Sequence, residues 1–485
     1  MWESGYMRDT RGKIITEKCC ACGACVSICP TMSIQLEIGS EGFYFPIVSD
    51  NCIGCNRCKV VCPMNSKLEQ NNATPKYIVA SSYNSQERLN SSSGGVFTAL
   101  AESVIDRKGV VYGCILNDDY IAQHIRVDKK IGLSKLKKSK YVQSYVGDLL
   151  RQVKVDLENG TLVLFVGTPC QIHGLKKYLE NVEYDNLITC DFFCHGIPAP
   201  GVWTKYVSKQ IEIGGNITHI DFRDKGSGWK NYSMCIGFED GHKYVTPHMK
   251  DPFYKMFLND WIINELCYDC KYKGDKSAAD ITIGDAWSVC HTGEIADDDT
   301  GVSFVVLSSK KGNSEWDLVR CGFEVANTTK ELVELNNGYK SKMQIPRMRD
   351  KIIDYYSKGV DFDYLCEVAN IGTINKPSID ILIYKKNIVI WGCGVAYHNN
   401  IDRVKRMFPN ILGCCESNSL RWGEEIDGYK IVSPSQLKLL DDVLVVIMLT
   451  NRTYINEVED ELIKMGVSDF IELNELIEGT RYEEV

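Results

Sequence analysis

The sequence has no apolar run long enough to cross a bilayer. Its longest run, V-L-V-V-I-M-L at residues 443–449, is far shorter than the roughly 20 apolar residues that a membrane-spanning helix needs, and it is typical of a buried strand. The first residues, M-W-E-S-G-Y-M-R-D-T-R-G-K, contain no apolar core, so we expect no signal peptide. We therefore predict a cytoplasmic protein without a membrane span.

The chain also lacks an excess of positive charge. Its 55 Lys and Arg residues are outnumbered by 64 Asp and Glu residues, and the formal net charge is −9. No stretch is rich in Lys and Arg with aromatic residues between them, so we expect no nucleic-acid partner. With 485 residues, of which 44% are hydrophobic and 25% charged, the chain is long enough for about two to four globular domains.

Cysteine, in contrast, is abundant, with 22 residues. In a chain without an export signal we expect these thiols to be ligands or core residues rather than disulfides. Two groups of them, at residues 19–30 and 52–63, repeat the pattern C-x2-C-x2-C-x3-C-P. This spacing is typical of bacterial ferredoxins with two 4Fe-4S clusters, and clusters of this kind also suggest an anaerobe.

In this pattern three cysteines of each run hold one cluster, and the fourth cysteine ligates the other cluster. The predicted ligands of the first cluster are Cys19, Cys22, Cys25 and Cys62, and those of the second are Cys29, Cys52, Cys55 and Cys58. Zinc is the alternative, but zinc sites normally pair two C-x2-C motifs across a long gap. Cys20 lies outside the pattern, and we do not expect it to be a ligand.

Composition and periodicity predict an α/β multidomain fold. We expect a small α+β ferredoxin domain at residues 1–68, followed by a polar linker. Strands alternate with helices over residues 77–348, which predicts a central α/β domain. The pattern restarts in a second, smaller α/β unit at residues 386–478.

Four further cysteines follow predicted strands of the central domain, at the edge where sites form in open α/β sheets. They are Cys170, Cys194, Cys267 and Cys270. If their loops converge, these thiols suit a third 4Fe-4S cluster. The residues are equally consistent with two small core cysteines and a C-x2-C pair that binds zinc.

A resemblance to a known family covers most of the central domain. Residues 77–348 carry, in this order, S-S-S-G-G-V-F-T-A-L, S-K-Y-V-Q-S, V-G-T-P-C-Q-I-H-G-L, F-C-H-G-I-P-A-P, F-R-D-K-G-S-G-W and C-Y-D-C-K-Y…A-A-D-I-T-I-G-D-A-W. Together these motifs resemble the coenzyme F-420 hydrogenase/dehydrogenase beta-subunit family, many members of which carry a fused ferredoxin module. The resemblance implies an iron–sulfur flavoprotein that binds FAD. It also implies that the four central cysteines are cluster ligands.

FAD needs a cradle for its pyrophosphate and donors near its isoalloxazine ring. The candidate contacts are Ser93, Gly94, Gly95, Lys140, Tyr141, Gly167 and Thr168. The Ser-Gly-Gly loop opens a predicted helix, which suits phosphate, although serine is also an ordinary N-cap. The Lys–Tyr pair matches a pair in the family, and its lysine could offset flavin charge or be a surface residue.

The candidates for catalytic roles are His195, Lys140 and Asp285. His195 follows a proposed ligand, so it could donate a proton to substrate or reduced flavin, or donate a hydrogen bond to cluster sulfur. Asp285 ends a predicted strand, where functional residues collect, but aspartate is also common in turns. A loop with Arg223, Lys225 and Trp229 could hold an anionic substrate or be a solvated turn.

The C-terminal unit begins I-V-I-W-G-C-G-V-A-Y-H, which resembles the dinucleotide motif G-x-G-x-x-G except that Tyr397 replaces the third glycine. Glu416 ends the next predicted strand, near the place of a ribose-binding acid. The unit resembles Rossmann-like units attached to sugar-modifying and acyl-transfer proteins. Both nucleotide binding and ligand-free docking of a partner are consistent with this sequence.

Together these features predict a ferredoxin-linked, FAD-dependent oxidoreductase. It would pass electrons between ferredoxin-type clusters and FAD and reduce or oxidise an unidentified organic substrate, for which a sugar-linked compound and a deazaflavin are two candidates. Its expected partner is ferredoxin or a similar electron carrier. The alternative is an electron-transfer subunit with no substrate of its own, which feeds a partner enzyme at the C-terminal unit.

Overall fold

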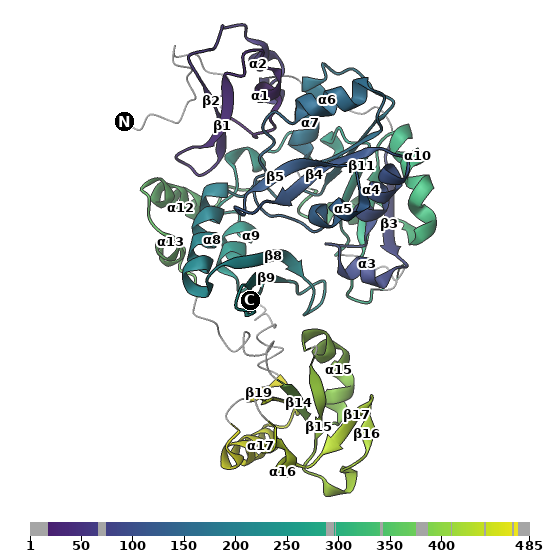
Figure 1. Ribbon diagram of the computed structural model, residues 1–485, viewed down its shortest axis with the longest axis vertical. Coiled ribbons are helices and arrows are strands. Elements are labelled where there is room, and N and C mark those ends of the chain that lie inside the picture. Colours follow the sequence, from purple (N-terminus) through teal and green to yellow (C-terminus); the bar gives the residue numbers. More distant parts are fainter. Residues whose placement is uncertain are drawn as a thin grey trace. The chain divides into compact units, whose positions relative to one another are not determined.

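The computed structural model describes residues 18–65, 74–287, 295, 297–339, 343–374, 387–408, 410–440, 443–467 and 470–473 (Figure 1). The N-terminal segment without an apolar core, most of the polar linker and both ends of the expected C-terminal unit lie outside these residues. The chain divides into two compact units, which we describe separately. One comprises Met1–Gln210 and Pro252–Ile374, and the other comprises Ile211–Asp251 and Asn375–Val485.

The ferredoxin module joins a two-stranded sheet to short helices and loops that carry the cysteines. Its elements are α1 (Ala24–Ile28), β1 (Ile34–Ile38), β2 (Tyr44–Val48), α2 (Arg57–Val60) and η1 (Pro63–Asn65). The strands are antiparallel, and their alternating buried residues share a core cluster with Val26 and with Cys19, Cys25 and Cys29. Gly23 begins α1 with a positive φ of 79°, a conformation that glycine adopts without strain.

The central domain is built on a mixed eight-stranded sheet in the order β13-β3-β12-β11-β7-β6-β4-β5. Its strands are β3 (Lys76–Ser82), β4 (Val110–Leu116), β5 (Ala122–Val127), β6 (Val163–Val166), β7 (Leu187–Phe192), β11 (Ile281–Asp285), β12 (Ser303–Leu307) and β13 (Phe323–Asn327). Strands β4, β6, β7 and β11 are parallel to one another, and the other four pair antiparallel. The carboxyl ends of the parallel strands therefore share one edge.

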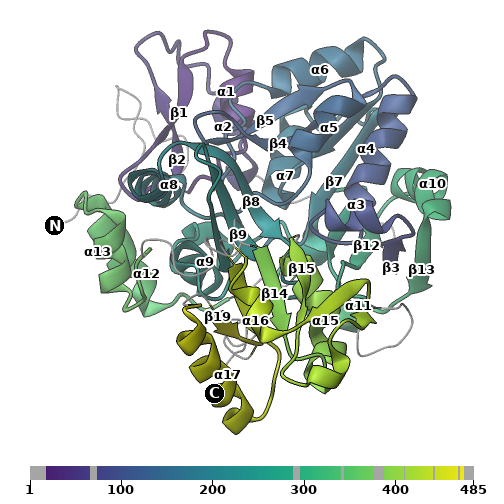
Figure 2. The ribbon, with the colours of Figure 1, turned by 60° about the horizontal axis from the view of Figure 1, so that its bottom comes forward.

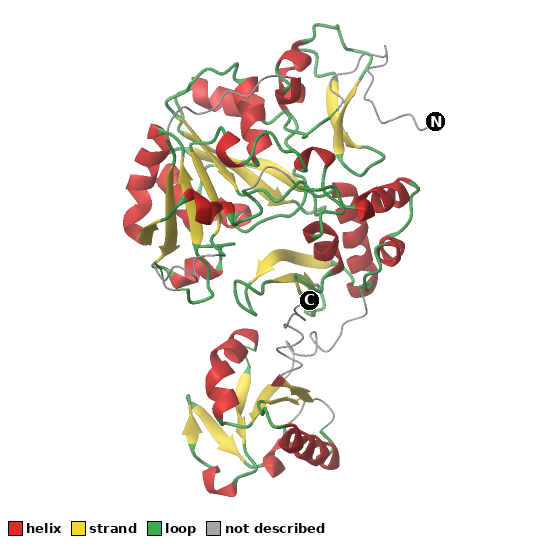
Figure 3. Ribbon diagram, turned by 180° about the vertical axis from the view of Figure 1, so that it is seen from behind, coloured by secondary structure: helices red, strands yellow, loops and turns green. Residues whose placement is uncertain are grey.

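Helices lie on both sides of this sheet (Figure 3). The helices of the first unit are α3 (Ser85–Leu89), α4 (Val96–Asp106), α5 (Lys130–Leu136), α6 (Leu150–Glu158), α7 (Pro169–Tyr178), α9 (Pro252–Leu258), η2 (Glu265–Cys267), η3 (Gly274–Lys276), α10 (Lys310–Val319), η5 (Arg320–Gly322), α11 (Lys330–Glu334), α12 (Arg347–Ser357) and α13 (Phe362–Val368), and α8 (Pro200–Gly214) begins in this unit. Leu100 of α4, Leu133 of α5 and Trp316 of α10 share one core cluster with the strands. Because both faces are covered, strands such as β6 are apolar throughout.

The second unit contains two further sheets. One is a three-stranded antiparallel sheet of β8 (Ile217–Asp224), β9 (Ser233–Phe238) and β10 (Lys243–Pro247). The other has the order β16-β17-β15-β14-β18-β19. Its elements are β14 (Asn387–Trp391), α15 (Val395–Met407), β15 (Ile411–Cys415), η6 (Ser419–Arg421), β16 (Glu425–Ile426), β17 (Tyr429–Val432), α16 (Pro434–Leu437), β18 (Val443–Ile447), α17 (Arg452–Met465) and β19 (Phe470–Glu472).

The five parallel strands of the C-terminal sheet follow the order 3-2-1-4-5 of a Rossmann fold. Helix α15 packs on one core cluster of this sheet and α17 on the other, and Figure 2 shows both helices. The apolar run at 443–449 contains β18, which is a buried strand as predicted. The whole molecule thus has an α/β multidomain fold. In the described part of the chain, no helix combines the length and apolar character needed to cross a membrane.

Candidate iron–sulfur and flavin site

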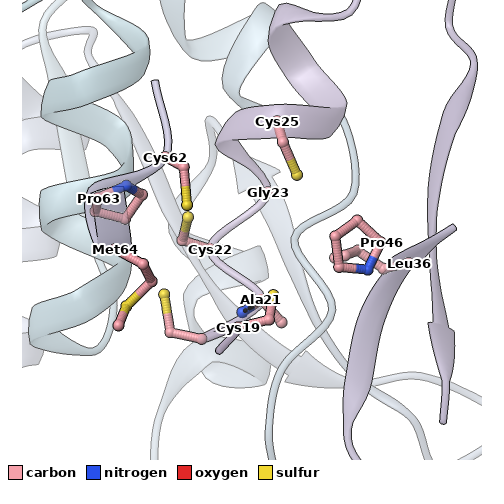
Figure 4. A pocket seen from close by; sticks show the side chains of 11 residues that line it. Cys19, Ala21, Cys22, Gly23, Cys25, Leu36, Pro46, Cys62, Pro63 and Met64 are labelled. Atoms are coloured by element: carbon pink, nitrogen blue, oxygen red, sulfur yellow. Dashed lines mark hydrogen bonds between the residues drawn. The ribbon is translucent and has the colours of Figure 1, made fainter. Parts of the chain in front are cut away.

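The structure gathers the ferredoxin cysteines into two groups. In the first, Cys19, Cys22, Cys25 and Cys62 line one cavity (Figure 4). Leu36 of β1 and Pro46 of β2 lie on another side of this cavity. The group therefore combines three cysteines of the first run with the fourth cysteine of the second run.

The second group contains the other four ferredoxin cysteines. Burial raises the pKa of Cys58, and the charges of the other three thiolates, Cys55, Cys29 and Cys52, raise it further. Burial alone would raise the pKa of Cys29, but hydrogen bonds from Thr31 and Ser33 hold it below its ordinary value. The backbone N–H of Ser33 lies 3.3 Å from Cys29 Sγ. Such N–H donors favour a thiolate, the form that binds iron.

A third group of four thiols lies at the carboxyl edge of the central sheet. Cys170 lies in the first turn of α7 after β6, Cys194 lies in the loop after β7, and Cys267 and Cys270 come from the segment around η2. Burial raises the pKa of Cys267, and the charges of the other three thiolates raise it further. The loops therefore converge, and four thiolates without other ligand types form the usual donor set of a 4Fe-4S cluster.

Local hydrogen bonds hold the loops of this third group. Thr168 caps α7 in a capping box with Gln171, and its hydroxyl lies 3.1 Å from Cys170 Sγ. The N–H of Ile197 lies 3.3 Å from Cys267 Sγ. Nζ of the buried Lys273 donates to the carbonyl oxygen of Cys194 at 3.1 Å. The sequence patterns did not single out Lys273.

The described cysteines are all free thiols. Among the described residues, no set of three or more His, Cys, Asp or Glu side chains has the spacing to bind a single metal ion. A cubane cluster has a different requirement, because each of its thiolates binds its own iron atom. The thiols in each of the three groups are therefore compared with the needs of a cubane cluster and not with those of a single metal ion.

The loop proposed as a phosphate cradle packs against the protein. Ser93 Oγ donates to the carbonyl oxygen of Val302 at 2.6 Å, and the N–H of Gly94 donates to Ser303 Oγ at 2.9 Å. A Cβ on Gly94 would lie 2.5 Å from the carbonyl oxygen of Ala80. The need for glycine at this position thus follows from packing on the sheet. Ser93 and Gly94 do not form an open cradle here.

The other candidate flavin contacts also have protein partners. Lys140 Nζ donates to the carbonyl oxygens of Lys135 and Lys137 at 3.0 and 2.6 Å. Gly95 begins α4 with a φ of 89°. The N–H of Gly167 donates to the carbonyl oxygen of Cys190 at 3.2 Å. The polar groups quoted for Ser93, Gly94, Lys140 and Gly167 thus bond within the protein, and the proposal of FAD in this domain is carried by the family resemblance.

His195 is paired with a carboxylate, since its Nε2 lies 2.6 Å from Asp260 Oδ1. Its ring also contacts the edge of Phe257 on α9, at 5.0 Å between centroids, and Tyr141 packs on the same phenyl ring at 5.2 Å. His195 and Tyr141 thus both pack against the side chain of Phe257. The backbone carbonyl of Asp285 accepts a hydrogen bond from Asn336 at 2.8 Å.

The candidate nucleotide site of the C-terminal unit also contains its own partners. Glu416 Oε1 accepts the N–H of Cys393 and a guanidinium N–H of Arg421, both at 2.9 Å. Gly392 has a φ of 102°, and Tyr397 of α15 is fully buried in the core. The Glu416 carboxylate therefore links the backbone of the glycine loop to the side chain of Arg421.

Sequence patterns missed a buried polar chain behind Cys170. Gln171 Nε2 donates to Ser144 Oγ at 2.8 Å, and this hydroxyl lies 3.1 Å from His124 Nδ1. The other ring nitrogen, Nε2, donates to the carbonyl oxygen of Val166 at 3.0 Å. Because a carbonyl only accepts, Nδ1 is the acceptor from Ser144. Burial lowers the pKa of His124 to about 4, so its imidazole is neutral.

We expect this imidazole to make the protein less stable as the pH falls. The folded pKa of His124 lies below its ordinary value of 6.5, so the unfolded chain takes up the proton first. The free energy of unfolding should therefore drop by about 1 kcal/mol between pH 8 and 5.5 from this group. Anaerobic denaturant titrations of wild type and His124→Gln at several pH values test this. In the variant, the free energy of unfolding should depend less steeply on pH. Equal slopes would contradict the assignment.

Three family models match parts of the chain. Residues 160–330 match the model for the C terminus of the coenzyme F420 hydrogenase/dehydrogenase beta subunit. Residues 12–69 match a 4Fe-4S dicluster domain, and residues 384–470 match a model described as C2185-like, N-terminal. No curated protein matches the chain.

Two solved structures are similar to parts of it. One is the xenon-derivatized F420-reducing NiFe hydrogenase complex from Methanosarcina barkeri, with 15% identity over 64% of this chain and 97% of that chain and a TM-score of 0.38. The other is RSP in complex with beta-NADH, with 13% identity over 33% of this chain and 65% of that chain and a TM-score of 0.15. Both scores are low, and neither likeness carries an argument about ligands. From the family models, the chain carries a domain of the coenzyme F420 hydrogenase/dehydrogenase beta-subunit family at residues 160–330, joined to a 4Fe-4S dicluster domain at residues 12–69.

Proposed function

We propose that this protein is an iron–sulfur oxidoreductase with three 4Fe-4S clusters. Electrons enter or leave through a ferredoxin-like carrier at the N-terminal module, and the third cluster connects that module to the central domain. The observation that carries the proposal is the convergence of four thiols from three separate segments at the carboxyl edge of the central sheet. Functional sites of open α/β sheets form at this edge.

The residues around the third group give its thiolates a specific environment. Burial raises the pKa of Cys194, and the charge of Cys170 raises it further, whereas Lys273 acts in the opposite direction. The buried Lys273 therefore supplies positive charge beside several negative ligands. Such a charge favours the reduced form of a cluster, because reduction adds one electron to an already anionic site.

We also propose FAD as a cofactor of the central domain, because the family resemblance implies it. When bound, FAD would convert single electrons into two-electron chemistry. The substrate would be organic, with a sugar-linked compound and a deazaflavin as two candidates. The candidate acid–base residue is His195, which Asp260 orients at 2.6 Å. A carboxylate partner of this kind fixes the orientation of the imidazole ring.

The purified, anaerobically reconstituted chain tests this function. We expect about one non-covalent FAD per chain, and we expect reduced ferredoxin to bleach the flavin band within the isolated protein. Turnover of a candidate substrate without another protein would support a self-contained enzyme. If the flavin is reduced but substrate turns over only with a second protein, the chain is an electron-transfer subunit. Reconstituted protein without flavin would contradict the flavoenzyme proposal.

A further inference from the structure

Cys20 lies between the first and the third groups of thiols. It is outside the ferredoxin pattern, but only 4% of its surface is exposed, and it lines the cavity of the first group. Its side chain lies close to the thiols of both Cys22 and Cys170. One residue thus lies beside a proposed ligand in each of two groups.

Helix α7 makes this close approach possible. Cys170 and Gly174 are four residues apart on α7, so they lie on the same face of the helix. A Cβ on Gly174 would lie 2.5 Å from Cys22 Cβ and 2.6 Å from Cys22 Sγ. Glycine in a helix interior costs about 0.5–1 kcal/mol relative to alanine. The close passage of the Cys22 loop is a physical reason for glycine at this position.

Further contacts hold the first group against the central domain. Tyr272 donates its hydroxyl to Met64 Sδ at 3.0 Å, and Asn264 Nδ2 donates to the carbonyl oxygen of Cys19 at 3.3 Å. The second group is placed differently, because the carbonyl oxygen of Cys29 accepts from the guanidinium of Arg151. The second group thus contacts the central domain through Arg151, whereas the first group lies beside a thiol of the third group.

From this geometry we propose that Cys20 is a positioning residue that couples the first cluster to the third. Its thiol lies between those of Cys22 and Cys170, and Gly174 sets how closely the two groups approach. Electrons then pass between the second, first and third clusters in that order, or in reverse. No bond is made or broken, and each step moves one electron between neighbouring clusters. This inference rests on the proposed function, since it requires a cluster in each group.

Cys20→Ala and Cys20→Ser test the role of the thiol. In Cys20→Ala we expect iron to stay at about 12 per chain, and the rate at which the third cluster is reduced to fall about tenfold or more. The potentials of the first and third clusters should shift, while that of the second stays constant. Cys20→Ser keeps a donor and should restore part of both properties. Cys366→Ala is the control, because Cys366 is fully buried in α13.

Gly174→Ala tests the approach independently of the thiol. The added methyl group should push the Cys22 loop away and weaken the magnetic coupling between the two reduced clusters in EPR spectra. Gly322→Ala is the matched control, because a Cβ there meets no atom within 4 Å.

The results distinguish a failure of the role proposed for Cys20 from a failure of the proposed function. Unchanged rate and potentials in Cys20→Ala would overturn the coupling role. A fall to about eight iron atoms in that variant alone would also overturn it, because Cys20 would then be a ligand. About eight iron atoms in the wild type would instead contradict the third cluster, and with it the proposed function.

Discussion

Replacing Cys170 with alanine should remove one whole cluster and leave the two ferredoxin clusters in place. Cys170 supplies one of only four thiols in the third group, and a cubane that loses one ligand is seldom retained. We expect iron and acid-labile sulfide to fall from about 12 to about eight of each per chain. Iron analysis and EPR of the reduced protein measure this loss.

Cys190→Ala is the matched control for this variant. Cys190 is a buried thiol of the same sheet, on β7, at 1% exposure, and it is not a predicted ligand. Equal loss of iron in both variants would indicate a general folding defect. Retention of about 12 iron atoms in Cys170→Ala would exclude this residue as a ligand of the third cluster.

Replacing Cys62 with alanine should remove the first cluster, although Cys62 belongs to the second run in the sequence. In the structure Cys62 lines the cavity of Cys19, Cys22 and Cys25. This group also contacts α7 of the central domain. Electron transfer from reduced ferredoxin to the third cluster should therefore fall by about 100-fold or more. Stopped-flow absorbance under anaerobic conditions measures the rate.

Cys29→Ala is the companion experiment. Cys29 is the fourth cysteine of the first run but lies in the second group, so its loss should remove the second cluster. The EPR signals of the first and third clusters should persist in that variant. If Cys62→Ala loses the second cluster and Cys29→Ala loses the first, each run holds its own cluster and the exchange of fourth ligands is wrong. A normal reduction rate in Cys62→Ala would contradict the path through the first cluster.

The sequence predicted features that depend on short-range spacing. The cysteine runs that begin at Cys19 and Cys52 predict cluster ligands, because the geometry of such a loop depends on residues that are close in the sequence. The apolar runs indicated an α/β fold for the same reason. Neither type of pattern contains information about distant partners, so the sequence does not indicate that Cys20 lies close to Cys170.

The proposed flavin loop shows the same limit. The pattern around Ser93 and Gly94 is typical of a phosphate-binding turn, yet these residues bond to Val302 and Ser303, which are 209 residues away. The network of His124 likewise joins strand β5 to helix α7 through Ser144. Such contacts depend on the order of strands in the sheet, and a local pattern does not specify that order.

The most direct test of the central claim is the iron and acid-labile sulfide content of the wild-type chain, purified and reconstituted without oxygen. The convergence of Cys170, Cys194, Cys267 and Cys270 predicts about 12 iron and 12 sulfide per chain, from three cubanes. A content of about eight of each, with only the ferredoxin signals in the EPR spectrum, would contradict the third cluster and the electron path that depends on it.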